Sequence, residues 1–487
     1  MSKYIKKNDL LPLLECHFHE NLTNSEYEVL FKPASELLTW NRLDLAFKLL
    51  YLEHKSNCIT FAEEIYREHI EALTLGSYKE PGNSEKNSAQ SFIDEFEHTF
   101  HAISSMGFDQ NQSIIPLSSG SIVNGAHRIA SAIVAGKPVA CVNIETEAHC
   151  YDYKFFYNRN VRTSSIEAAV SQFIEKAPNV HIALIWPSAI GHEKELISLI
   201  PNIIYRKDIN LTGKGAKNLL INVYHSESWL GSYVNQFKGV QGKLVECFKT
   251  TNPLRAIAFQ ANTHEEVLLI KEKIRALYKL GKHSIHTTDT ATEALRVSRI
   301  LFNDNGVHFL NYAEPYKYSD NFSEIKKVHQ FLKYSGLKPD DILIDGSLIL
   351  SLYGIRKNQD IDYLTVREVI KETLPILNIN NHNEEAHYHG QEKNTLIANP
   401  KFHFYYEGIK FISFEQLYKM KKNRGEIKDI NDCNMMDSLI ENKWIRVIFH
   451  KVRQNIFYLN TYFLNLAYLV LNLSIRPAVS INLVLPV

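Results

Sequence analysis

The chain has 487 residues, and because a single hydrophobic core rarely extends beyond about 250–300 residues, we expect two to four domains. Lys plus Arg and Asp plus Glu both number 54, so no global charge favours stable binding to nucleic acid. The six scattered cysteines form no C-x-x-C pair. This spacing argues against a zinc knuckle or a disulfide framework and favours the reduced thiols of a cytoplasmic protein.

The first part of the chain has helical periodicity, and we expect a helical N-terminal region over residues 1–87. Its first residues lack the apolar core of a signal peptide. Short strands are predicted at 113–117 and 139–144, with a helix from 126 to 134 between them. These elements predict an α/β unit over residues 88–176.

A turn at Asn124-Gly125 opens this helix, and His127 and Arg128 follow at once. Backbone N–H groups at a helix start and a forked guanidinium suit a phosphate. The segment resembles the ParB/sulfiredoxin-like fold, whose signature is Asp-Gly-x-His-Arg, with Asn124 in place of the Asp. The resemblance implies a nucleoside triphosphate site in a fold that includes a free serine kinase, and it makes Glu80 the candidate acidic catalytic residue. The alternative is a structural turn with a surface arginine.

A second unit is expected over residues 177–312, where strand and helix signals alternate. The segment from Lys282 to Ala294 resembles the active-site segment of nucleoside diphosphate kinases, Asn-x-x-His-Gly-Ser-Asp-Ser-x-x-x-Ala. The resemblance implies a ferredoxin-like βαββαβ sheet and makes His286 the phosphorylated histidine. A neutral imidazole can attack a γ-phosphoryl group and carry it as a covalent intermediate. The family's ligand-binding positions correspond to Arg275, Tyr224, Thr288 and Asp289.

This segment departs from the kinases at two positions. Trp186 stands where the family has its catalytic lysine, and His283 stands where it has asparagine. A missing phosphate-facing ammonium removes a charge-assisted contact. Active phosphotransfer and a nucleotide-binding or structural module therefore remain alternatives.

A third unit is expected over residues 322–440. Gly346-Ser347 follows a predicted strand and precedes an apolar helical turn, which suits an anionic phosphate. Asp360 and Asp362 flank one apolar residue on a second strand, so both carboxylates should point to one face. Two such carboxylates with substrate phosphates are a typical Mg²⁺ site, and we expect Asp360 and Asp362 to be the metal ligands and catalytic residues.

These residues resemble the nucleotidyltransferase superfamily that includes polymerase beta, with Gly-Ser, about a dozen residues, and then Asp-x-Asp. The resemblance implies that Gly346, Ser347 and Arg356 contact triphosphate, and that Lys421, Arg424 and Lys428 face the phosphates or the adjacent surface. Many members have a third carboxylate on the strand before the last helices. That strand offers His403 here, with Glu407 as a substitute just beyond it, and His382, His387 and His389 are interpreted as loop residues.

The last part of the chain, 441–487, is predicted to be an apolar tail. From 456 to 487 it has one charged residue, Arg476. A helix packed on the body and a peripheral membrane anchor are the alternatives, so a membrane-associated fraction is compatible with the cytoplasmic prediction.

The expected architecture is an α+β multidomain chain: a ParB/sulfiredoxin-like α/β unit, a ferredoxin-like unit and a nucleotidyltransferase α/β unit, with helical additions at both ends. The expected function is Mg²⁺-dependent nucleotidyl transfer, with ATP or CTP as cofactor and a small phosphorylated metabolite as acceptor, for instance in surface glycan decoration. The phosphotransfer-type units would prepare that acceptor. The alternatives are a nucleotide-sensing scaffold with degenerate sites and a toxin-like transferase that modifies protein or tRNA. The sequence leaves the oligomeric state open.

Overall fold

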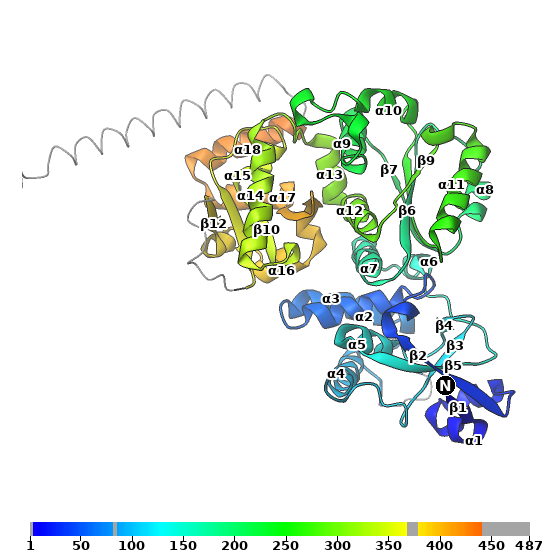
Figure 1. Ribbon diagram of the computed structural model, residues 1–487. Coiled ribbons are helices and arrows are strands. Elements are labelled where there is room, and N and C mark those ends of the chain that lie inside the picture. Colours follow the sequence, from blue (N-terminus) through cyan, green and yellow to red (C-terminus); the bar gives the residue numbers. More distant parts are fainter. Residues whose placement is uncertain (1–2, 81–84, 368–377, 441–487) are drawn as a thin grey trace, which may run out of the picture.

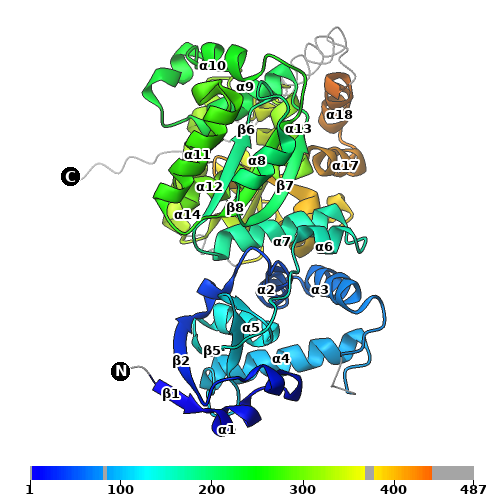
Figure 2. The same ribbon diagram turned by 90° about the vertical axis from the view of Figure 1, so that its right-hand side faces the viewer.

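The computed structural model describes residues 3–80, 85–367 and 378–440, and within them the chain forms three α/β units, each built on its own sheet (Figure 1). The expected mixed α/β multidomain architecture is confirmed. In Figures 1 and 2 the N-terminal unit lies at one end of the molecule, below the central and C-terminal units. The tail over 441–487 lies outside the described residues.

The N-terminal unit has a five-stranded sheet in the order β1-β2-β5-β3-β4. Its strands are β1 (Lys3–Lys6), β2 (Glu26–Pro33), β3 (Ile115–Ser118), β4 (Ser121–Ile122) and β5 (Pro138–Asn143). β3 and β5 are parallel and the other neighbours are antiparallel. The helices are α1 (Lys7–Leu10), α2 (Asp44–His54), α3 (Ile59–Thr74), α4 (Ala89–Met106), α5 (Ala126–Ala135), α6 (Tyr153–Tyr157) and α7 (Thr163–Lys176). The predictions of β3, α5 and β5 are confirmed.

The prediction that residues 1–87 are helical is wrong for β1 and β2, which belong to this sheet. In β2 the buried Tyr27 and Val29 alternate with the exposed Glu26 and Glu28, as expected for a strand that covers a core with one face. β2 pairs with β5, so the sheet crosses the expected boundary at residue 87.

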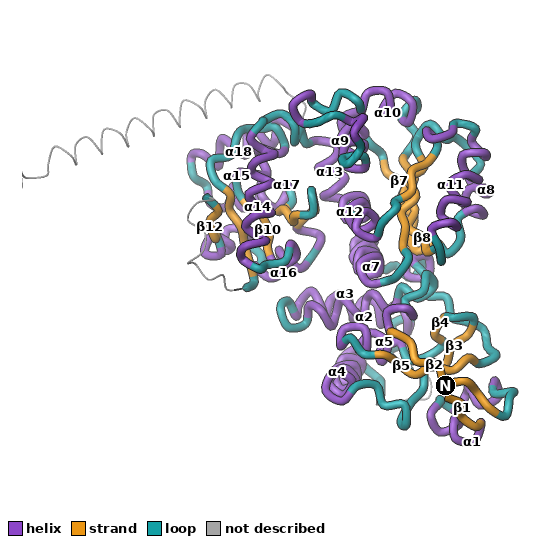
Figure 3. The backbone as a smooth tube through the Cα atoms, viewed as in Figure 1, coloured by secondary structure: helices purple, strands orange, loops and turns teal. Residues whose placement is uncertain are grey.

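The central unit has a four-stranded sheet in the order β7-β8-β6-β9, with all neighbours antiparallel. Its strands are β6 (Val180–Ile185), β7 (Ile203–Ile209), β8 (Leu254–Gln260) and β9 (Ile285–Thr287). Its helices are α8 (Glu193–Leu199), α9 (Gly213–Val223), α10 (Val240–Cys247), α11 (His264–Tyr278), α12 (Ala291–Leu301) and α13 (Asp304–Tyr312). Figure 3 shows α8 and α11 on one face of the sheet and α9, α12 and α13 toward the other. Both faces are covered, so β6 and β8 are almost entirely buried.

The C-terminal unit has a five-stranded sheet in the order β12-β11-β10-β14-β13. Its strands are β10 (Ile342–Asp345), β11 (Ile361–Thr365), β12 (Ile379–Asn381), β13 (His403–Tyr406) and β14 (Ile409–Ile412). Its helices are α14 (Asp320–Ser335), α15 (Ser347–Leu352), α16 (Lys393–Ala398), α17 (Phe414–Arg424) and α18 (Ile427–Ile440). The predicted strand 342–344 is confirmed as part of β10.

The three units share one large apolar cluster, which runs from Ala34 to Met436. α7 packs against α2 and α12 and so connects the N-terminal and central units. The Asn394 side chain donates a hydrogen bond to the Asn57 carbonyl and connects α16 to the N-terminal unit. No helix within 3–80, 85–367 and 378–440 combines the length and apolar character needed to span a bilayer.

Candidate functional site

Three carboxylates meet where β10 ends and β11 begins. β10 and β11 are antiparallel with Asp345 opposite Asp362, and Asp360 directly precedes β11. Paired residues of antiparallel strands project to the same face, as do residues two apart on one strand. The Ser347 hydroxyl donates to Asp360 Oδ1 at 3.3 Å and thereby connects the start of α15 to this end of the sheet. The charge of Asp360 contributes to the raised pKa of Asp362, so these two carboxylates lie near each other.

Gly346 is required by the close approach of Asp362 to the backbone. Its φ is +72°, in the left-handed region, and a Cβ added there would collide with Asp362 Oδ2. The Gly-Ser turn thus brings the backbone directly against the Asp362 carboxylate.

The crowding of these carboxylates changes their protonation. Burial, followed by the charges of Asp360 and Asp345, raises the pKa of Asp362 to about 7. Burial alone would raise the pKa of Asp345 as well, but the contact with His389 outweighs it and lowers that pKa. His389 Nε2 lies 3.1 Å from Asp345 Oδ2, and His382 Nε2 lies 3.1 Å from Asp362 Oδ1. Two of the three histidines interpreted as loop residues thus contact the acidic group.

The donor set fits Mg²⁺. Asp345 Oδ1 is buried and has no hydrogen-bond partner within the described residues, whereas Asp362 Oδ1 has His382 Nε2 3.1 Å away. Within those residues no group of three or more His, Cys, Asp or Glu side chains is arranged to hold a metal ion. Mg²⁺ does not need such a group, because one or two carboxylates with substrate phosphates are its usual ligands. Asp360 and Asp362 would be the protein ligands.

His403 and Glu407, which were expected in place of a third carboxylate, do not lie beside Asp360 and Asp362. His403 is buried in β13 and its Nδ1 contacts the Leu396 carbonyl at 3.1 Å. Glu407 lies in the turn between β13 and β14. The carboxylate that lies opposite Asp362 is Asp345.

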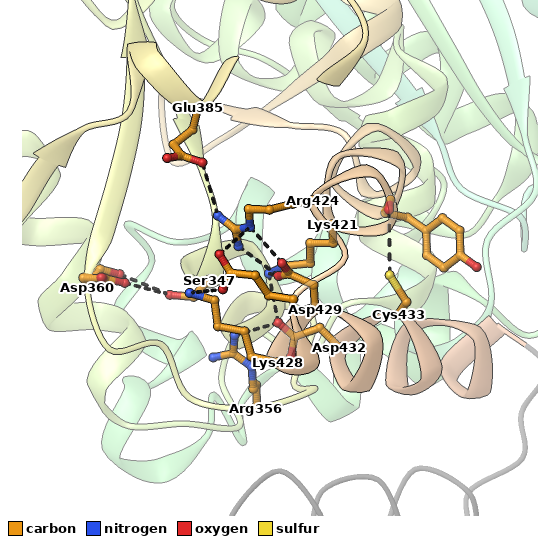
Figure 4. A network of polar contacts seen from close by, with 12 residues as sticks. Ser347, Arg356, Asp360, Glu385, Lys421, Arg424, Lys428, Asp429, Asp432 and Cys433 are labelled. Atoms are coloured by element: carbon orange, nitrogen blue, oxygen red, sulfur yellow. Dashed lines mark hydrogen bonds and ion pairs between the residues drawn. The ribbon is translucent and has the colours of Figure 1, made fainter. Parts of the chain in front are cut away.

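The basic residues expected at the phosphates are mostly engaged with buried carboxylates (Figure 4). Lys421 Nζ lies 3.0 Å from Asp429 Oδ1 and 2.9 Å from Asp432 Oδ2, and its side chain is 3% exposed. Lys421 therefore does not face a ligand in this arrangement. Arg424 contacts Asp429, and Arg356 makes a two-pronged contact with Asp432. Lys428 is partly exposed on α18 and pairs with Glu426 at 3.0 Å.

The central unit has a basic, aromatic pocket of about 560 Å³. Four of the predicted residues line it: His286, Tyr224, Arg275 and Asp289. The other lining residues are Glu227, Trp229, Gly239, Gly242, Lys243, Lys271, Lys282, His283 and Ile285. Cationic side chains beside two aromatic rings suit a ligand that carries both phosphate and a flat ring.

His286 is oriented by Glu293, whose Oε1 lies 3.0 Å from its Nε2. When neutral His286 donates Nε2–H to Glu293, Nδ1 carries the ring lone pair. Thr288 does not line the pocket: it is fully buried, and its hydroxyl accepts the Ile182 N–H at 2.9 Å. Trp186 is also fully buried and packs near Phe248. The expectation that Thr288 contacts a ligand is therefore wrong.

The N-terminal unit has a pocket of about 570 Å³ that brings together all five predicted residues, Glu80, Asn124, Gly125, His127 and Arg128. Glu80 pairs with the buried Lys86, which also lines the pocket, at 2.6 Å. His127 Nε2 lies 2.9 Å from the Tyr66 hydroxyl, and burial keeps the pKa of His127 well below its usual value. Arg128 lies over Gly125, where an added Cβ would crowd its guanidinium.

The sequence arguments missed three residues that shape these sites. Asp345 could have been found, because it ends a buried strand directly before Gly346-Ser347. Glu293 had a weaker signal, as an acidic residue in the first turn of the helix after His286. Lys86 had none, since only the fold brings it to the pocket.

No protein-family model, curated protein or solved structure gives a significant match to this chain. Function is therefore inferred from the geometry of the sites themselves.

Proposed function

We propose that the C-terminal unit is a Mg²⁺-dependent nucleotidyltransferase. The observation that carries this proposal is the pairing of Asp345 with Asp362, with Asp360 near them and the Gly346-Ser347 turn against Asp362. Three carboxylates this close repel one another, as the raised pKa of Asp362 indicates. Such a group suits a site that binds a cation together with an anionic substrate.

In this proposal Asp360 and Asp362 would hold one Mg²⁺, which would supply charge neutralisation for the triphosphate. Ser347 fixes Asp360 through its hydroxyl, and Gly346 leaves room for the Asp362 carboxylate. A phosphate oxygen of the acceptor forms a bond to the α-phosphorus, the bond to the β-phosphate bridging oxygen breaks, and pyrophosphate leaves. The protein's own contribution is to position the reactants in line.

The substrates proposed are ATP or CTP and a small phosphorylated metabolite, with surface glycan decoration as one purpose. The N-terminal unit would phosphorylate the acceptor at the pocket of Glu80, Asn124, His127 and Arg128. The ParB/sulfiredoxin-like assignment is supported by the parallel strands β3 and β5, which α5 connects. The ferredoxin-like assignment is supported by the central strand order, since β9-β6-β8-β7 is the order of a βαββαβ sheet.

A second candidate function is nucleotide binding or phosphotransfer at the central pocket. It is favoured by His286, Tyr224 and Arg275 lining one basic cavity, and by Glu293 orienting the imidazole. Trp186 is buried in the place of a phosphate-facing lysine, which favours binding over transfer. A sensing scaffold and a toxin-like transferase acting on protein or tRNA remain the rival functions.

One labelling experiment separates these functions. The full chain is incubated with Mg²⁺ and each α-³²P or γ-³²P triphosphate, and the label is followed into small molecules, protein and tRNA. Label from the α-phosphate in a small product supports the proposed transferase, and Asp362→Asn should abolish it while Asp437→Asn, an exposed change on α18, should not. Label in protein or tRNA supports the toxin-like function. Binding without turnover supports the scaffold.

A further inference from the structure

A chain of buried ion pairs connects α17 and α18 to the loop that carries Asp360. We call Arg356, Lys421, Arg424, Asp429 and Asp432 the charge clamp. Figure 4 shows it running from Arg424 through Asp429, Lys421 and Asp432 to Arg356. Each carboxylate of the charge clamp contacts two cations, and Lys421 contacts both carboxylates.

The charge clamp is too deeply buried to be a surface feature. The side chains of Asp429 and Asp432 are 0% exposed. A buried carboxylate that loses its cation is left uncompensated in a medium of low polarity, which is strongly unfavourable. The buried carboxylates therefore restrain the cations that they contact. Asp432 holds the Arg356 guanidinium in place, and Lys421 supplies the second positive charge that the buried Asp432 needs.

Arg356 transmits this constraint to the acidic site. It lies in the loop 353–360 between α15 and β11, and Asp360 is the last residue of that loop. Arg356 Nε lies 2.6 Å and Nη2 2.8 Å from the two oxygens of Asp432, and two parallel contacts fix orientation as well as distance. The neighbouring pair Lys357–Asp320 is exposed, so it restrains the loop much less.

We propose that Lys421 and Asp432 are positioning residues, which hold Arg356 and through it keep Asp360 in register with Asp362. This proposal rests on the proposed nucleotidyl transfer. It reassigns Lys421: the lysine acts inside the protein, through Asp432 and Arg356, and does not contact phosphate.

The test measures hydrogen exchange of the loop 353–360 together with kcat and KM for the triphosphate. Asp432→Asn and Lys421→Met should speed exchange in this loop and lower kcat roughly 10- to 100-fold, with a smaller change in KM, because a misplaced Asp360 impairs the reaction more than binding. Lys421→Arg should restore most of the kcat. Matched controls are the exposed neighbours on the same helices, Lys422→Met and Asp437→Asn.

The outcomes separate the two proposals. If the wild-type chain transfers no nucleotide, the proposed function fails and this inference fails with it. If the wild type is active but Asp432→Asn leaves loop exchange and kcat unchanged, only the positioning role is overturned. Equal losses in Lys421→Met and Lys421→Arg would also overturn it. A melting curve for each variant identifies any that fails to fold, and Lys421→Arg, which keeps the charge, then decides the question through the same two readouts.

Discussion

Replacing Asp362 by Asn removes one of the three carboxylates at the start of β11, and its effect on stability should depend on Mg²⁺. The pKa of Asp362 is raised from the ordinary 3.8 to about 7 by burial and by its two acidic neighbours. Because the folded state binds this proton more tightly than the unfolded state, protonation of Asp362 stabilises the fold. This contribution is fully present below about pH 4 and is lost as the pH rises to about 7. Wild type without metal should therefore lose stability across this interval.

The size of the effect follows from the shift. At about 1.4 kcal/mol per pKa unit, keeping Asp362 charged at pH 8 costs the metal-free protein up to about 4 kcal/mol. Because Asn carries no charge, Asp362→Asn should be more stable than wild type at pH 8 in EDTA, by about 1–4 kcal/mol. Mg²⁺ at 100 times its Kd should add about 2.7 kcal/mol to wild type and much less to the variant.

The assay is urea unfolding at pH 8 in EDTA and in Mg²⁺, with Asp437→Asn as the control for loss of an exposed carboxylate. The reasoning is refuted if Asp362→Asn is less stable than wild type in EDTA. It is refuted equally if Mg²⁺ stabilises the variant as much as it stabilises wild type.

Three further changes test other parts of the molecule. Arg128→Ala should reduce labelling of residues 113–137 by a photoreactive triphosphate about tenfold, because a charge-assisted contact is lost, and unchanged labelling by peptide mass spectrometry would count against a phosphate site there. His286→Asn should remove any acid-labile ³²P from the protein while leaving KM for nucleotidyl transfer unchanged, and label that persists would exclude this histidine. The neighbouring Arg299 and Lys410 lower the pKa of Asp340 to about 2. A carboxyl group with a lowered pKa stabilises the folded state above about pH 4. The free energy of unfolding should therefore fall between pH 4 and pH 2, and Asp340→Asn should make this fall smaller in urea titrations.

Local sequence patterns were sufficient to predict a strand or helix where the residues that define it lie in one short segment. β3, α5, β10 and β11 follow from short apolar runs and from glycines at the turns. The prediction that Asp360 and Asp362 share one side used the period of a strand, and Asp360 lies directly before β11. Glu80 and Arg128 line the same pocket, and the sequence predicted this only through a family resemblance.

Contacts between distant segments could not be predicted in the same way. The pairing of Lys421 with Asp432 depends on how α17 and α18 pack, and a spacing of eleven residues across a helix break does not specify it. The burial of Thr288 depends on its pairing with the backbone of β6, which lies over a hundred residues earlier. β2 was missed because its partner β5 lies far along the chain, so its alternating pattern had no neighbouring strand to support it.

The pairing of β2 with β5 has a consequence for how the protein is made. The two strands are separated by roughly 100 residues of sequence, so β2 leaves the ribosome long before its partner exists. Until then its hydrogen-bonding edge is open to other chains, and we expect nascent chains to need protection from self-association over this interval. A chain that lacks β2 would leave the β5 edge open permanently.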